Sequence, residues 1–169
     1  SLAAVILVTG TLSTSGIVTA QSSFGKWSVV ATGFLPFLVF MVAATAELNR
    51  PPFDLVEADG ELVGGYMTEY GGGGFALYFF AEYLNVIVVS GIATAVFLGG
   101  WLLPFGIHPP SWVDPFVVLG KMMIFIVFFI WVRATLPRLR YDQLMSFGWK
   151  VLLPLATLNV LVTAIIVVA

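Results

Sequence analysis

The sequence contains no cysteine, a single histidine and few charged residues, and each shortage excludes a class of function. Without cysteine the chain has no disulfide framework, no thiolate nucleophile and no cysteine-ligated zinc or iron–sulfur site. One histidine, His108, argues against a histidine-based metal site. Charged residues are 9% of the 169, against about a quarter in an average soluble domain. Seven Lys and Arg leave no basic stripe for a nucleic acid.

Hydrophobic residues, in contrast, make up 60% of the chain, and the mean hydropathy is +1.04. A helix needs about 20 apolar residues to cross roughly 30 Å of hydrocarbon, and an open sheet would leave unpaired edges in lipid. Five windows are long enough: about 2–19, 29–46, 75–100, 116–135 and 147–168. The sequence therefore predicts an all-α integral membrane protein, a single membrane domain over residues 1–169 with about five transmembrane helices.

The start of the chain and its basic residues predict how these helices are oriented. The chain opens in an apolar run without methionine or a basic n-region, so we expect a membrane helix rather than a signal peptide, and further chain upstream. Alternation of the helices places segments 48–74 and 136–146 on one side of the membrane. Five of the seven basic residues lie in these segments or at the adjoining helix ends, against Lys26 and Lys121 on the other side. The first side is therefore predicted to be cytoplasmic or its organellar equivalent.

Acid is concentrated in the loop 47–74, between the second and third windows. From residue 48 to 74, Arg50 stands against five carboxylates, a net charge of -4: Asp54, Glu57, Asp59, Glu61 and Glu69. Pro51–Pro52 is expected to end the preceding helix. Asp54 and Glu57 have capping-box spacing, and Gly64–Gly65 is a helix stop, so a short helix is predicted at about Leu55–Val63.

Two interpretations of this acidic loop remain open. It is either a solvated loop with a charged helix face, or a buried site in which clustered carboxylates raise one another's pKa and exchange protons near neutral pH. Apolar residues such as Phe53, Leu62 and Tyr66 alternate with the acids, which favours burial against another surface.

A second acidic position lies inside the membrane. Glu82 falls about 9 Å from the centre of the third window, within a half-thickness of about 15 Å, so its side chain should face protein or water. Tyr78, Glu82 and Asn85 share one helix face, as in a proton path; a single interhelical hydrogen bond is the alternative. Glu47, at the end of the second window, is either part of the same path or an interfacial anchor. The arginines at 133, 138 and 140 are typical of positive-inside anchors, with Arg133 the expected exception because it lies within an apolar run.

Several stretches, in the same order along the chain, resemble the H subunit of NADH-quinone oxidoreductase, the counterpart of mitochondrial complex I subunit 1. The resemblance lies in seven segments and covers the chain from about Val29 onward: Ala46–Leu55, Glu61–Tyr66, Thr68–Tyr70, Ala81–Tyr83, Phe97–Trp101, Trp131–Thr135 and Arg138–Leu144. The family protein is about twice as long, so the chain resembles its C-terminal portion. Two positions depart from the family pattern: Asp59 stands where Glu is frequent, and Gly71–Gly74 replaces a stretch that usually contains serine and ends in a basic residue.

The resemblance implies a membrane subunit that helps to form a quinone-access chamber and couples quinone reduction to proton translocation. By motif position, the chamber and its loop would involve seven residues: Arg50, Phe53, Asp54, Glu57, Asp59, Glu61 and Glu69. Glu47 and Glu82 would lie on the proton path. Quinone would be the substrate, and FMN and iron–sulfur clusters would belong to partner subunits of the membrane and peripheral arms. A bacterial or archaeal inner membrane is the expected location, with an organellar inner membrane as the alternative.

Two other functions remain possible at this stage. The chain would be the equivalent subunit of a membrane-bound hydrogenase or of a dehydrogenase that uses ferredoxin or a deazaflavin. Alternatively it would belong to an ion channel or secondary transporter with an acidic vestibule, although the sequence shows no inverted repeat of the kind that transporters contain.

Overall fold

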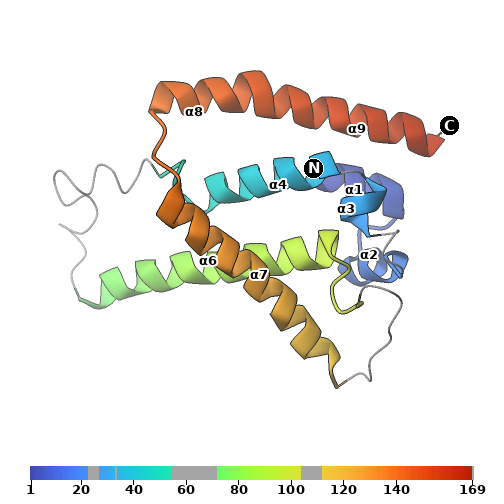
Figure 1. Cartoon of the computed structure of the whole chain (residues 1–169), viewed down its shortest axis with the longest axis horizontal. Helices are drawn as coiled ribbons and strands as arrows, with labels where there is room; N and C mark the ends of the chain where they lie inside the picture. The colour runs from blue at the N-terminus through green and yellow to red at the C-terminus, as the bar shows by residue number, and fades with distance from the viewer. Residues whose placement is uncertain (23–26, 33, 55–71, 104–111, 169) are drawn as a thin grey trace.

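The computed structural model describes residues 1–22, 27–32, 34–54, 72–103 and 112–168, and the regular structure within these ranges is entirely helical (Figure 1). The predicted all-α class is therefore confirmed. The helices, in chain order, are α1 (Leu2–Thr9), α2 (Thr14–Ala20), α3 (Ser28–Ala31), α4 (Phe34–Glu47), α6 (Gly73–Phe97), α7 (Asp114–Thr135), α8 (Tyr141–Phe147), the π-helical turn η4 (Gly148–Leu152) and α9 (Leu153–Val168).

Three helices are long and apolar enough to cross a membrane, and they match the third, fourth and fifth windows. They are α6 with 25 residues, α7 with 22, and the continuous rod from α8 to α9 with 28. At about 1.5 Å per residue these lengths are roughly 33–42 Å, enough for a hydrocarbon core of about 30 Å. Only 11–22% of their most apolar stretches is buried inside the chain. The remaining apolar surface is what a helix exposes when its solvent is lipid.

The sequence predicted one straight helix over the first window. The structure shows two helices instead, because the chain bends at Gly10. α1 ends there with a φ of 69°, and the N–H of Gly10 donates to the carbonyl of Ile6 at 2.8 Å. Glycine takes this left-handed conformation without the steric cost that a Cβ would add. α2 then begins at Thr14, bent by 65° from α1, so the pair forms a broken span or a re-entrant loop.

The second window is also shorter than predicted. α4 contains 14 residues, which corresponds to about 21 Å, and the four-residue α3 precedes it. The structure therefore supports three spans, or up to four if α1 and α2 count as one, within the described part of the chain. The number five stays a prediction.

Elements from both halves of the chain share one apolar core. α6 packs mainly against α7, and α1 packs against α9. The largest fully buried side chain among the described residues is that of Phe97, which contacts the rings of Phe37 and Phe40 at centroid distances of 5.4 and 5.2 Å. The end of α4, the start of α6, the end of α7 and the start of α8 lie at the same end of the molecule, on the left of Figure 1. This end contains Arg50 and Asp54, at the start of the sequence-predicted acidic loop.

The opposite end of α6 is closed by a lysine. The Nζ of Lys121, on α7, donates to the carbonyls of Leu98, Gly100 and Leu102 at 2.7, 2.8 and 2.5 Å. The same ammonium lies 4.7 Å from the ring centroid of Trp27. The last carbonyls of a helix have no partner within the helix, so Lys121 satisfies a turn that would otherwise expose polar groups to lipid.

Candidate functional site

The local structure at the end of α4 positions Arg50. The N–H of Asn49 donates to the carbonyl of Ala46 at 3.2 Å, and that of Arg50 donates to the carbonyl of Thr45 at 3.3 Å. Asn49 has a φ of 47°. These two bonds around a left-handed residue form a Schellman motif, in which asparagine is the usual substitute for glycine. Pro51 and Pro52 follow, and the chain turns so that Arg50 points back into the protein.

Arg50 joins the start of the acidic loop to the polar position of α6. Its Nη2 lies 2.9 Å from the Oε1 of Glu82, and its guanidinium lies 5.2 Å from the ring centroid of Tyr83. The side chain of Arg50 is 6% exposed and that of Glu82 is 33% exposed. Because the arginine is the more deeply buried partner, removal of the carboxylate would leave a buried cation uncompensated, which is costly in a medium of low polarity. The pair therefore fixes the loop to the membrane helix.

Asp54 is held from a different direction, by the segment between α7 and α8. Asp54 is 2% exposed, and its Oδ2 lies 3.5 Å from the Nη2 of Arg138. Next to this pair, the N–H of Leu139 donates to the carbonyl of Pro52 at 2.9 Å. The stretch 50–54 is thus attached to α6 on one side and to the α7–α8 connection on the other.

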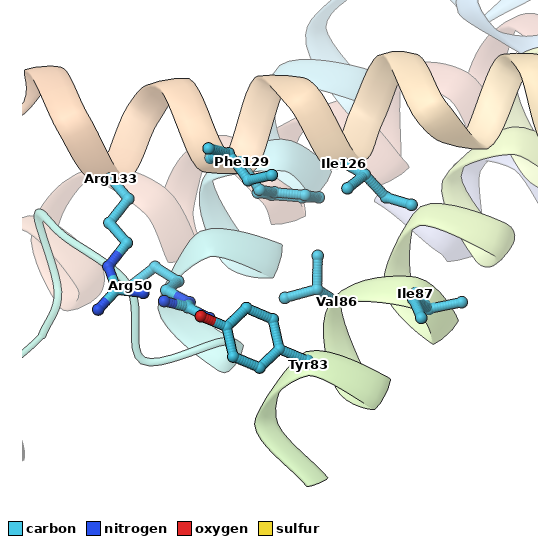
Figure 2. A pocket seen from close by; sticks show the side chains of 8 residues that line it. Arg50, Tyr83, Val86, Ile87, Ile126, Phe129 and Arg133 are labelled. Atoms are coloured by element: carbon cyan, nitrogen blue, oxygen red, sulfur yellow. The ribbon is translucent and has the colours of Figure 1, made fainter. Parts of the chain in front are cut away.

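Two apolar pockets flank α7 near this stretch. The first, of about 330 Å³, lies between α6 and α7, and Arg50, Tyr83 and Arg133 line it (Figure 2). The second, of about 320 Å³, lies between α4, α7 and α8, and Phe53 lines it. The ring of Phe53 is stacked at 6.5 Å on that of Phe147. Both volumes fall at the lower end of the range typical of small-molecule sites.

The structure brings some of the sequence-predicted residues together and leaves others apart. Arg50, Phe53 and Asp54 lie in one buried turn, and Glu82 contacts it through Arg50. Glu47 is exposed at the end of α4, and its side chain makes no ion pair or hydrogen bond with the residues that the structure describes. The helix predicted at Leu55–Val63 and four of the predicted loop acids lie outside the described residues: Glu57, Asp59, Glu61 and Glu69.

Of the four glycines at 71–74 that depart from the family pattern, the structure describes the last three. Gly72, with a φ of 58°, precedes the helix, and Gly73 and Gly74 form the first turn of α6, which thus begins two residues earlier than predicted. Within the described ranges, no group of three His, Cys, Asp or Glu side chains is placed to hold a metal ion.

Sequence reasoning missed three contributors: Tyr83, Arg138 and Phe147. Tyr83 follows Glu82 directly, but only the direction of its ring reveals that it meets Arg50. The sequence predicts only membrane anchoring for Arg138, and its contact with Asp54 depends on how α7 leads back to the end of α4. Contacts between residues so far apart in sequence leave no local signal in a single sequence. Arg133, the expected exception among the arginines, does line a pocket.

Comparison with known proteins identifies the family. The family model described as NADH dehydrogenase matches residues 1–164. The chain is 51% identical over 164 residues to the H 1 subunit of NADH-quinone oxidoreductase from Geobacter metallireducens, a match that covers 96% of the chain and 47% of that protein. It is 50% identical over 169 residues to the H subunit from Frankia alni, covering 97% of the chain and 36% of that protein. With the H subunit from Dehalococcoides mccartyi the identity is 47%, over 100% of the chain and 45% of that protein.

The chain thus spans less than half the length of these curated relatives. The matches extend through all the segments that carried the resemblance, from the AELNRPPFDL stretch at 46–55 to the α7–α8 connection. Together with the all-helical fold and the apolar helices of α6, α7 and α8–α9, they show that the chain belongs to the NADH dehydrogenase family.

Proposed function

We propose that this chain is part of a membrane subunit of an NADH-quinone oxidoreductase, in which it helps to form the quinone chamber and couples quinone reduction to proton translocation. The names of its relatives support this assignment over a hydrogenase or a ferredoxin- or deazaflavin-dependent enzyme. Partner subunits would carry FMN and iron–sulfur clusters, because this chain has no cysteine to ligate a cluster. A bacterial or archaeal inner membrane would hold the complex.

The observation that carries the proposal is the ion pair between Arg50 and Glu82 at 2.9 Å. It connects the start of the acidic loop, where the chamber is proposed, to a carboxylate within a membrane-spanning helix. A change of charge in the loop alters the field at Arg50, and Arg50 is the direct counter-ion of Glu82. At an effective dielectric constant of about 20, two unit charges 4 Å apart interact by about 4 kcal/mol, so the interaction between Arg50 and Glu82 is strong enough to couple the two groups.

The proposed site for the quinone is the pocket lined by Phe53. Its walls come from α4, α7 and α8 and include Met41, Phe128 and Phe147, which suit an aromatic ring with a hydrocarbon tail. The loop acids that follow Asp54 in the sequence, together with Asp54 itself, would supply or receive protons as the quinone is reduced. Glu82 and Glu47 would continue the proton path toward the membrane.

The test is the substitution Glu82→Gln in the intact complex, with quinone reduction and proton translocation measured together. We expect fewer protons to be translocated per quinone reduced, because an amide cannot exchange a proton. Asp142→Asn is the matched control: it makes a comparable change, carboxylate to amide, at an ion pair of α8 whose side chains are 75–80% exposed, and we expect coupling to be unchanged.

The double variant Arg50→Gln with Glu82→Gln separates the relay from the stability of the ion pair. It removes the buried cation that the single variant leaves uncompensated. A coupling defect that the double variant relieves comes from the uncompensated cation and not from the lost carboxylate. Reductase activity and proton translocation at wild-type levels in Glu82→Gln would refute the proposed relay.

A further inference from the structure

The pocket lined by Phe53 ends at two stacked aromatic rings. It runs along α4 toward Phe53, and the ring of Phe147, from α8, lies on the ring of Phe53. Among the described residues that line the pocket, Thr45 alone has a polar side chain, and its hydroxyl donates to the carbonyl of Val42 at 2.8 Å. A quinone in this pocket therefore meets no side chain that can give up a proton, although Asp54 follows Phe53 directly.

The helix that carries Phe147 is attached to the chain mainly through its two ends. None of the seven residues of α8 is buried. Within the described ranges, the polar contacts of α8 stay inside the helix and its N-terminal cap. The stretch 136–140 before it is not helical, and Figure 1 shows it as an extended connection from α7. The stack of Phe147 on Phe53 is thus the main contact of α8 with the pocket.

The turn that follows α8 is π-helical, and Pro154 explains why. The N–H of Leu153 donates to the carbonyl of Gly148, five residues earlier instead of four. Proline has no N–H for the carbonyl of Lys150, and its ring would clash with that carbonyl in a regular α-helix. The π turn η4 avoids the clash by taking up one extra residue, and such turns are frequent at functional sites.

A π turn that converts to an α turn rolls the helix before it. The extra residue joins the regular helix, so α8 turns by about 100° relative to α9, which is the angle that one residue of an α-helix spans. The direction that Phe147 has in the structure then belongs to the next residue, Gly148. No atom lies within 4 Å of a Cβ added to Gly148, so this residue is free to move. The roll exchanges a ring for a hydrogen atom at the end of the pocket.

We propose that α8 is a lid on the Phe53 pocket, that η4 is its hinge, and that Phe147 is the residue that gates the ligand. In the closed state, which the structure shows, Pro154 favours the π turn and Phe147 covers Phe53. In the open state Gly148 replaces Phe147, and the ligand reaches past Phe53 to the turn that contains Asp54. The identity of the ligand as a quinone rests on the proposed function, whereas the roll of α8 does not.

Two variants of the hinge push the lid in opposite directions. Pro154→Ala supplies the missing N–H to the carbonyl of Lys150, so we expect it to favour the α turn and the open state. Deletion of the exposed Val151 in the Pro154→Ala chain also removes the extra residue. The rod then becomes α-helical with Phe147 still directed at Phe53, and the lid is locked closed. Deletion of the exposed Ile166, near the end of α9, is the matched control, because it shortens the rod without changing the register of α8.

The readout is the reactivity of Gly148→Cys with a maleimide in the intact membrane complex, resolved by peptide mass spectrometry. The chain has no other cysteine. Position 148 points into open space in the closed state and against Phe53 in the open state. We expect Pro154→Ala to slow the reaction several-fold and the added deletion of Val151 to restore the original rate. The added deletion of Ile166 should leave the slow rate unchanged.

Decylubiquinone, a short-chain quinone, is the ligand probe. We expect it to slow the reaction of Gly148→Cys in the chain with an unchanged hinge, and to have no effect once the deletion of Val151 has locked the lid. Equal reactivity with and without Pro154→Ala would show that α8 does not roll and would overturn the proposal, even if the deletion variant does not assemble. Reactivity that depends on the hinge but not on the quinone would support the lid and exclude the quinone as its ligand, so the two failures are distinguishable.

Discussion

Two cations that lie against α6 are held in different ways. Each lies over an aromatic ring: Arg50 over Tyr83, near the middle of α6, at 5.2 Å, and Lys121 over Trp27, beside the C-terminal end of α6, at 4.7 Å. Both distances are within the range of a cation–π interaction. The three donors of Lys121 meet three backbone carbonyls, whereas Arg50 meets one carboxylate and keeps a donor without a partner among the described residues.

The difference separates a structural cation from one that is available for function. Lys121 has no donor left to offer a ligand, and its acceptors are backbone groups that cannot change charge. Arg50 contacts a carboxylate and lines a pocket between α6 and α7. We therefore expect substitution of Lys121 to reduce stability, and substitutions around Arg50 to alter the proposed coupling as well.

The largest loss of stability is expected for Lys121→Met. Methionine preserves the apolar stem but removes the donor from three carbonyls, and we estimate a loss of about 3 kcal/mol in the free energy of unfolding. Thermal melting of the detergent-solubilised protein measures it. Lys150→Met is the control, because Lys150 is exposed in η4. The melting temperature of this variant should stay close to that of the wild type. Equal melting of the two variants would show that Lys121 does not stabilise the end of α6.

Gly100→Ala should come next, with a loss of about 2 kcal/mol. Gly100 has a φ of 51°, and a Cβ added there would lie 2.9 Å from a methyl of Val18. Gly120→Ala on α7 is the matched control, because no atom lies within 4 Å of its added Cβ. In a helix this change should stabilise the protein by up to about 1 kcal/mol. Thermal melting of the detergent-solubilised protein measures both changes. A Gly100→Ala variant as stable as the wild type would contradict the close approach of α2 to the turn after α6.

Arg138→Gln tests the attachment of the stretch 50–54 to the α7–α8 connection. We expect a loss of about 1–2 kcal/mol, less than for a fully buried pair, because Arg138 is 33% exposed and the contact is 3.5 Å long. Asp54→Asn should cost less, since the partner left behind can reach solvent while Asp54 cannot. Denaturation of both single variants and the double variant gives the coupling energy of the pair. If that energy is zero, the α7–α8 connection does not hold Asp54 in place.

The smallest effect is expected for Arg140→Gln. Arg140 and Asp142 form an ion pair at 3.2 Å, but their side chains are 80% and 75% exposed. Exposed pairs of this kind contribute less than about 1 kcal/mol, so the melting temperature should barely change. A large shift would mean that this surface is covered, for example by a partner subunit.

Composition and motifs predicted the fold class and the long membrane helices, but not the places where helices break. The apolar windows at 75–100 and 116–135 matched α6 and α7 closely, because the length of an apolar run is sufficient to specify a membrane helix. The windows at 2–19 and 29–46 were wrong in detail. Hydropathy does not register the left-handed glycine at Gly10 or the short helix before α4, since both concern backbone conformation and not polarity.

The sequence by itself determined that this is an all-helical membrane protein of the NADH dehydrogenase family, and it singled out Arg50, Phe53, Asp54 and Glu82 as candidates for its chemistry. Apolar length and ordered motifs are local properties of the chain, so they can be recognised without a fold. Only the tertiary structure decided that Arg50 pairs with Glu82 and that Arg138 reaches Asp54. These contacts depend on how α4, α6 and α7 cross, and packing between distant segments sets that crossing.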